Sequence, residues 1–518
     1  MSDNKVQQDR ELLQSVEGKG LGAKLGVFTR LSGPGWLQSA ITLGGGSLAG
    51  SLYIGVIGGY DMLWLQPMMM ILGIVMLSAI AYVTLSTGEK PFHAINKHVN
   101  PVLGWGWLFA AMIANLVWAM PQFSLGTAAM QQNLGLNLSN EVCTFMLFAI
   151  AAVVIWFYDA GGWGIKLFEI LLKILVGLIV LAFFAVVIAL ATNGQLDGGA
   201  VIAGFIPDFS LLSQPAAELR PFIDASTNPD YWTDQVVSIQ KNTMIAAAAT
   251  AVGINMTFLL PYSMLRKGWD KTFRGLATFD LSTGLFVPFV LATSCVVIAA
   301  ASQFHAQAPA IAADTVYADM EGGAQGNLEK MVAAVDAAGL EQARTEQDAI
   351  DLAVEEGRID IPDNRYGDFI DANSNLADKQ LSVMVIKRDA GALAGSLEQV
   401  FGNKTIAQYI FGFGVVGMAI STIIILMLIN GFCLCEAMGR PGDKKLHFLG
   451  SLIPGFLGLC FPLIWTAESK AALAVPTSVI GSSLLPSAYF IFLLMMNSKK
   501  LLGNAMPTGG KRVIWNVL

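Results

Sequence analysis

The chain has 518 residues, a mean hydropathy of +0.58 and only 13% charged residues. This composition excludes an ordinary soluble globular protein, in which about 25% of residues are charged. The formal net charge of −7 does not identify a partner, because basic and acidic residues are sorted to different sides of long apolar segments. We expect the lipid bilayer to surround most of the chain, and we expect no nucleic-acid partner.

The apolar segments are long enough to cross a membrane as helices, since a bilayer core about 30 Å thick needs roughly 20 apolar residues. They are continuously apolar, whereas barrel strands alternate. We therefore predict an all-α integral membrane protein with ten transmembrane helices. The expected spans are 34–57, 62–87, 102–130, 142–158, 164–192, 240–265, 276–302, 404–433, 446–466 and 471–496.

Basic residues gather before the first span and after the sixth, eighth and tenth spans, whereas the short loops 58–61 and 131–141 carry none. The positive-inside rule then places the N-terminal segment 1–30 and the tail 497–518 in the cytoplasm. The first thirty residues show no cleaved signal peptide. We expect a monomeric, multi-pass protein of the cytoplasmic membrane.

Two of the expected spans are interrupted. Residues Gly44, Gly45, Gly46 and Ser47 lie in the middle of span one, where each glycine costs a helix about 1 kcal/mol relative to alanine. Span six, five spans later, carries the polar stretch 252–257 at its middle. Paired interruptions of this kind indicate an inverted-repeat transporter whose half-helices bind the substrate. Close helix packing is the alternative explanation for the glycines, and the matching break in span six disfavours it.

This pattern divides the chain into units. The first five-helix repeat covers 31–192, and the second combines helices six and seven (240–302) with helices eight to ten (404–496). An external loop, 193–239, lies between the repeats. An acidic extracytoplasmic insertion, 303–403, interrupts the second repeat. Its acidity favours a solvated face over a device that concentrates cations.

The opening of span one, Gly33-Pro34-Gly35-Trp36-Leu37, resembles the GPG(F/W)L motif of the Nramp family of divalent metal transporters. At the same distance the family continues with Asp-Pro-Gly-Asn, where this chain has Gly44 to Ser47. The family's Met-Pro-His motif of span six falls in the region from Gly253 to Thr257. The resemblance covers most of the membrane domain, residues 31–302 best, and the insertion 303–403 lies outside it.

Several departures from the family pattern concern its metal ligands. The metal-binding Asp is replaced by Gly44 and the Asn by Ser47, and the Met falls on Gly253 or Asn255, depending on the register. The paired acids of span three are replaced by neutral residues around 120–123. This pattern resembles the Nramp-related magnesium transporters, a divergent prokaryotic branch. The resemblance implies Mg²⁺ transport on a ten-span, leucine-transporter-like 5+5 fold with broken helices one and six.

The two breaks together supply the candidate metal site. Its residues are Gly44, Gly45, Gly46, Ser47, Gly253, Asn255, Met256 and Thr257. Neutral oxygen donors and small side chains suit the outer shell of a hydrated Mg²⁺, which is reluctant to lose its waters. Met256 is open to two interpretations. It packs in the membrane core, or it points inward and keeps a soft ligand that favours transition metals.

Few acidic residues lie inside the spans. We expect Glu169 to pair with Lys173, four residues away, and Asp280 to lie near Arg274. With no histidine at a span centre, we predict transport of largely hydrated Mg²⁺ by alternating access, without obligatory proton coupling and without a cofactor.

Two other functions remain open on the same fold. One is transport of Mn²⁺ or another divalent transition metal, as in typical Nramp proteins. The other is cation-coupled symport of an organic solute. An enzyme is not expected, because the chain has no HExxH or G-x-S-x-G motif.

Overall fold

The computed structural model describes residues 3–161, 163–307, 315–356, 358, 364–388, 390–398, 402–460, 462 and 474–517. Every regular element within these residues is a helix, which confirms the predicted all-α class. The main helices of the first half are α1 (Asp3–Gln14), α2 (Leu21–Leu31), α3 (Pro34–Thr42), α4 (Gly45–Gly58), α5 (Leu65–Thr87), α6 (Pro91–His98), α7 (Pro101–Ala128), α8 (Asn140–Ala160), α9 (Trp163–Thr192), α10 (Gly198–Ala203) and α11 (Arg220–Asp224). Those of the second half are α12 (Pro229–Ala251), α13 (Met256–Arg266), α14 (Arg274–Asp280), α15 (Val287–Phe304), α16 (Gly322–Glu355), α17 (Arg365–Ala372), α18 (Leu376–Met384), α19 (Ala390–Ser396), α21 (Lys404–Ala437), α22 (Lys444–Leu459), α24 (Ala474–Met496), α25 (Lys499–Leu502) and α26 (Gly509–Val517).

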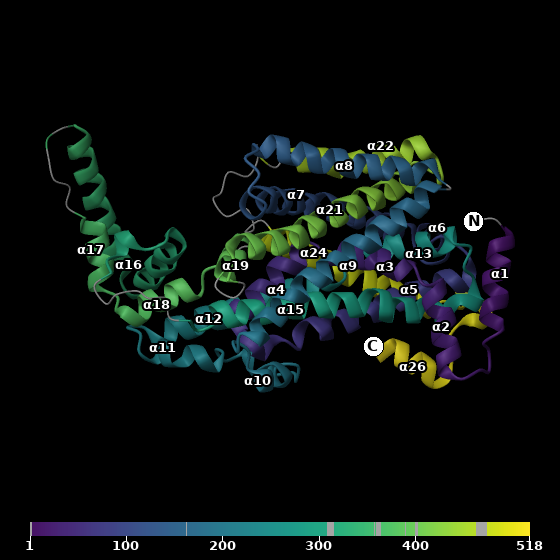
Figure 1. The fold of residues 1–518 in the computed structure, drawn as a ribbon, viewed down its shortest axis with the longest axis horizontal. Coiled ribbons are helices and arrows are strands. Elements are labelled where there is room, and N and C mark those ends of the chain that lie inside the picture. Colours follow the sequence, from purple (N-terminus) through teal and green to yellow (C-terminus); the bar gives the residue numbers. More distant parts are fainter. Residues whose placement is uncertain are drawn as a thin grey trace.

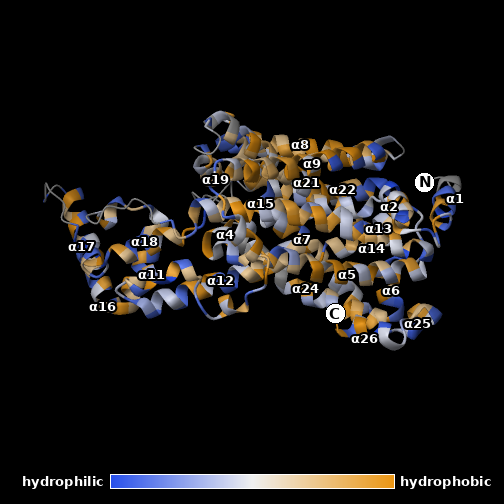
Figure 2. Cartoon of the chain, turned by 60° about the horizontal axis from the view of Figure 1, so that its bottom comes forward, coloured by the Kyte–Doolittle hydropathy of each residue, from blue (hydrophilic) through white to orange (hydrophobic). Residues whose placement is uncertain are grey.

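The long apolar helices lie side by side along the long axis of the molecule (Figure 1). Helices α16, α17 and α18 project beyond one end of this bundle, and both chain ends lie in the opposite half. Hydrophobic residues dominate the bundle, including its outer helices α8 and α9, whereas α16 and α17 are largely hydrophilic (Figure 2). The distribution is that of a membrane-embedded bundle with a water-exposed extension.

Seven helical segments of the described chain are long and apolar enough to cross a membrane, and eight if a bent pair at the first span is included. They agree with the first eight expected spans. The expected ninth and tenth spans, 446–466 and 471–496, coincide with α22 and α24. Parts of both expected spans fall outside the described residues. The count of ten spans therefore includes α22 and α24 as the ninth and tenth.

The first span is broken where the glycines predicted it. Helix α3 ends at Thr42 and α4 begins at Gly45, and the two helices are bent by 58° relative to each other. Gly44 lies between them in an extended conformation, with φ −121° and ψ −175°. The sixth span is also interrupted, because Val252 is extended (φ −144°, ψ 117°) and helix resumes only at Met256. Both predicted breaks are confirmed.

The segments 193–239 and 315–386 pack together at the end of the bundle that carries α16 to α18. They share a hydrophobic cluster that includes Trp232, Leu328 and Leu381, together with Ile54 and Ile57 from α4. The buried carboxylate of Asp378 accepts hydrogen bonds from Trp232 Nε1 (2.7 Å) and from the backbone N–H of Thr227 (3.1 Å). Helix α12 begins in this extension at Pro229 and runs to Ala251, next to the break in span six.

Two acidic residues inside the spans have other partners than the sequence predicted. Glu169 lies 3.9 Å from Lys267 rather than pairing with Lys173. Asp280 accepts hydrogen bonds from the backbone N–H groups of Gly33 (2.9 Å) and Gly35 (2.6 Å). It therefore caps the N-terminus of α3, where unpaired N–H groups and the helix dipole favour a carboxylate. Both residues serve structure at the bundle end rather than a path through its centre.

Candidate metal-binding site

A cavity lies between the two breaks, where the ends of four half-helices meet. Its walls come from α3, α4, α7, α12, α13 and α21, together with the linking residues of both breaks. The space between these walls, including the part that opens outward, is about 380 Å³. The candidate metal site was predicted at this junction of spans one and six.

Six of the eight candidate residues line this cavity, namely Gly44, Gly46, Ser47, Gly253, Asn255 and Met256. The other two are held by the surrounding structure. The backbone N–H of Gly45 donates to the side chain of Gln122, and the hydroxyl of Thr257 accepts from Trp107 Nε1 at 2.9 Å. That hydroxyl also lies 2.5 Å from the carbonyl oxygen of Ile254. Gly45 and Thr257 therefore support the breaks from behind.

Ser47 connects the two breaks. Its hydroxyl oxygen lies 2.5 Å from the carbonyl oxygen of Thr42 and 3.3 Å from that of Thr250. Those carbonyls belong to the last turns of α3 and α12. Because Ser47 is only 2% exposed, its hydroxyl joins two helix ends in a site that protein atoms almost fully enclose.

Asn255 supplies an unpaired acceptor to the cavity wall. Its amide nitrogen donates to Asn115 Oδ1 on α7 at 3.0 Å. Its amide oxygen is buried and has no hydrogen-bond partner. Since an unpaired buried acceptor is destabilising, this oxygen is available to a ligand or to water in the cavity.

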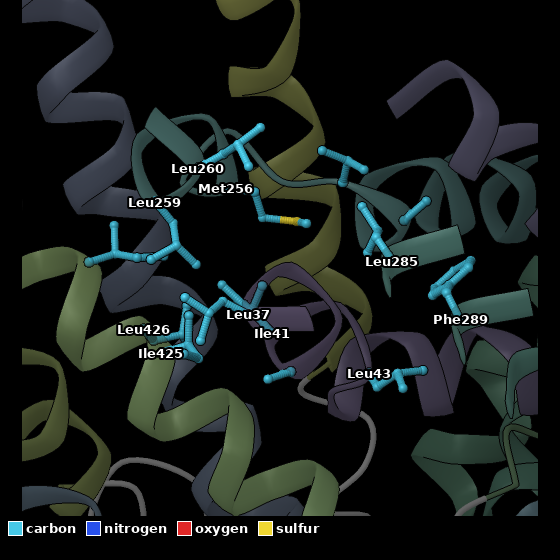
Figure 3. Close-up of a cluster of buried hydrophobic side chains, with 14 of the residues drawn as sticks. Leu37, Ile41, Leu43, Met256, Leu259, Leu260, Leu285, Phe289, Ile425 and Leu426 are labelled. Atoms are coloured by element: carbon cyan, nitrogen blue, oxygen red, sulfur yellow. The ribbon is translucent and has the colours of Figure 1, made fainter. Parts of the chain in front are cut away.

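Met256 points toward the cavity rather than packing elsewhere. Its sulfur accepts from the backbone N–H of Gly253 at 3.4 Å and lies 3.4 Å from the hydroxyl of Thr42. Figure 3 shows Met256 in the same buried cluster as Ile41 and Leu426, which also line the cavity. One side of the wall is thus apolar, and the one soft atom found in the wall already interacts with two polar groups.

Among the residues that the structure describes, no ionisable side chain lines the cavity. In the parts of the chain that the structure describes, no three His, Cys, Asp or Glu side chains come together as a metal centre. Helix ends of both signs border the cavity, since α3 and α12 end there at Thr42 and Ala251 and α4 and α13 begin there at Gly45 and Met256. The C-terminal end of a helix carries about half a negative charge.

Four wall residues come from spans three and eight and were not among the candidates: Trp118, Gln122, Thr422 and Leu426. A Cβ atom added to Gly44 would lie 2.5 Å from Thr422 Oγ1, and one added to Gly253 would lie 2.3 Å from the Trp118 ring. The glycines therefore admit large neighbours as well as breaking the helices. The sequence offered only a weak signal for these partners, namely polar or aromatic residues within apolar spans.

The wall offers neutral oxygen donors, one thioether and helix ends of both signs. Such a set holds a divalent cation loosely, or through its waters, because hard cations prefer oxygen ligands and carboxylates supply most of the charge at tight sites. It also provides no nucleophile or general base in the described lining.

Comparisons with known proteins are consistent with this geometry. The family model described as "Natural resistance-associated macrophage protein-like", or Nramp, matches residues 35–335 and 374–517. The match leaves out only 336–373 between these parts, so the gap is narrower than the insertion 303–403. A search of curated proteins found no match.

Solved structures give a likeness of fold. A mutant of the manganese transporter of Eremococcus coleocola is 14% identical, with 95% of this chain and 84% of that chain covered and a TM-score of 0.53. A second mutant of the same transporter is 13% identical, with 92% and 96% covered and a TM-score of 0.46. The first likeness shows a shared fold.

Proposed function

This chain belongs to the Nramp family of membrane transporters, and we propose that it carries Mg²⁺ across the cytoplasmic membrane as a largely hydrated ion. The proposal includes alternating access around the cavity between the two breaks, without obligatory proton coupling. It places both chain ends in the cytoplasm and takes the protein as a monomer. The metal is the transported substrate and not a resident cofactor.

The observation that carries this proposal is that the described residues of the cavity wall include no carboxylate. A dehydrated transition metal needs charged or soft ligands to replace its waters. Mg²⁺ instead keeps several waters when bound, so that neutral groups such as Ser47 and Asn255 need only contact those waters. The resulting weak binding suits an abundant ion.

The absence of obligatory proton coupling rests on Gln122, a neutral residue of α7 that lines the cavity. An amide does not exchange a proton in the physiological range, whereas intramembrane acids commonly do. The membrane potential suffices as a driving force, because two charges moving inward gain about 4.6 kcal/mol per 100 mV.

Transport of Mn²⁺ is the second candidate function. Met256 favours it, because its sulfur lines the cavity and a thioether prefers softer metals. The hydrogen bond from the Gly253 N–H to this sulfur, at 3.4 Å, opposes direct ligation. We therefore place Mg²⁺ first.

The test is cation entry into proteoliposomes that contain the full chain, under an inside-negative potential, with a trapped Mg²⁺ dye and lumenal pH read in parallel. We expect Mg²⁺ entry without acidification, and we expect Asn255→Leu to raise the KM for this entry while leaving entry measurable at high Mg²⁺ concentration. Asn430→Leu is the matched control, because Asn430 is equally buried but donates to Gly450 O outside the cavity.

Three outcomes would overturn parts of the proposal. Entry of Mn²⁺ but not Mg²⁺ would favour the second candidate. Acidification that accompanies Mg²⁺ entry would contradict uncoupled transport. Entry of neither metal would favour a cation-coupled symporter of an organic solute.

A further inference from the structure

Asn115 lies directly behind the cavity wall, on α7, and faces Asn255. Both side chains are fully buried, and Asn255 Nδ2 donates to Asn115 Oδ1 at 3.0 Å. Asn255 lines the cavity, whereas Asn115 is not part of its lining. Asn115 therefore acts on the cavity only through Asn255.

We propose that Asn115 is a positioning residue that orients the Asn255 amide with its oxygen toward the cation. This inference deepens the proposed function, because it assumes that the cavity receives a cation. It assigns Asn115 a role in affinity without contact between Asn115 and the ion.

The argument depends on the two ends of an amide. The NH₂ end of Asn255 is a donor, and its oxygen is an acceptor that also attracts cations. A partner that accepts draws the NH₂ end toward itself and leaves the oxygen free. The oxygen of Asn115 is such a partner, and the Asn255 oxygen is the atom left without a bond.

The reverse pairing would retain one hydrogen bond between the same two residues. It would, however, present the NH₂ group of Asn255 to the cavity, where a donor repels a cation. The structure holds the favourable orientation even though the NH₂ group of Asn115 is itself buried and unpaired. Buried unpaired donors are rare in folded proteins. A role in orienting Asn255 explains why the NH₂ group of Asn115 stays unpaired.

A double-mutant cycle tests the inference in the full-length transporter. Asn115→Leu is close in volume and removes the acceptor, so we expect the KM for Mg²⁺ entry to rise by about 10-fold, as for residues that orient metal ligands. The maximal rate should change little. In the Asn255→Leu background the same substitution should have no further effect, because there is no amide to orient.

Two more variants separate positioning from general packing. Asn115→Asp keeps an acceptor and should restore the KM close to that of the unmodified protein. Asn430→Leu, a buried amide elsewhere in the bundle, should lower thermal stability without changing the KM. If the effects of Asn115→Leu and Asn255→Leu add, the positioning role is wrong.

The cycle also distinguishes this inference from the proposed function. If the unmodified protein carries Mn²⁺ and not Mg²⁺, the magnesium proposal fails, and the cycle is measured with Mn²⁺. Non-additivity would then still support Asn115 as a positioning residue. Equal KM values for Asn115→Leu and the unmodified protein, with either ion, would overturn it.

Discussion

The side-chain oxygen of Gln122 accepts a hydrogen bond of 2.7 Å from the backbone N–H of Gly45. Gly45 is the first residue of α4, so Gln122 caps the half-helix that begins after the first break. Gln122 also lines the cavity. One neutral residue of span three thus caps the broken helix and leaves its own part of the cavity wall uncharged.

Replacement of Gln122 by alanine should destabilise the fold locally. The variant leaves the Gly45 N–H buried and unpaired, which costs about 1–3 kcal/mol. We expect a lower melting temperature in detergent and slower Mg²⁺ entry. An unchanged melting temperature would show that water replaces the amide at this helix end.

Replacement of Gln122 by glutamate should preserve the cap and change the ion chemistry. The carboxylate still accepts from Gly45, and it adds a negative charge to a wall whose described residues carry none. Divalent cations should bind more tightly, and entry should become slower at acidic pH because the carboxylate then binds a proton instead of the metal. Isothermal titration and entry assays at several pH values test this. A pH-independent variant would contradict it.

Gly44→Asp should strengthen Mn²⁺ binding by providing the missing carboxylate. The new Cβ atom would lie 2.5 Å from Thr422 Oγ1, so the substitution needs Thr422→Ala to make room. We expect the double variant to bind Mn²⁺ more tightly in calorimetry than Thr422→Ala alone, which serves as the control. No gain would count against Gly44 as part of the site.

The water-exposed end of the bundle should show a pH-dependent contact. His305 Nε2 lies 3.4 Å from a carboxylate oxygen of Glu218, and this contact holds the pKa of the Glu218 carboxyl below its usual value. The stabilisation is therefore complete above about pH 4.3, the ordinary value for Glu, and is lost as the pH falls through the lower pKa of the folded state. Glu218 is 53% exposed, so the effect is small.

The difference in melting temperature between the unmodified protein and Glu218→Gln should exist at pH 7 and shrink toward pH 3. Glu355→Gln, which removes a carboxylate from an exposed position of α16, is the control. A difference that stays constant with pH would contradict a role for the ionised carboxylate.

Local sequence features predicted the helices and both breaks. Apolar length marks the helices, clustered glycines mark the first break, and a polar stretch marks the second. Glu169 shows where such reasoning ends. Its helix neighbour Lys173 was the expected partner, yet Lys267 lies 3.9 Å away across the bundle. Contacts between spans depend on how helices rotate against one another, and one sequence does not specify that rotation.

The candidate site shows the same division. Six residues of the cavity wall follow from the breaks themselves. Asn115 and Gln122 come from span three and Thr422 from span eight, and each meets the breaks only through tertiary packing. Their polarity within apolar spans indicated that they have partners, but not which partners these are.

Met256→Leu should separate the two candidate metals. The substitution nearly conserves volume, so it should cost less than about 1.5 kcal/mol of stability. It removes the sulfur, the only soft atom in the described wall of the cavity.

If the ion passes with its waters, Mg²⁺ entry should be unchanged, because hydrated Mg²⁺ does not use a thioether. If Mn²⁺ is the substrate and binds the sulfur, Mn²⁺ entry should fall and its KM should rise. Competition of Mn²⁺ against Mg²⁺ in the same vesicles measures this directly. A loss of Mg²⁺ entry in a stable Met256→Leu variant would contradict binding of the hydrated ion.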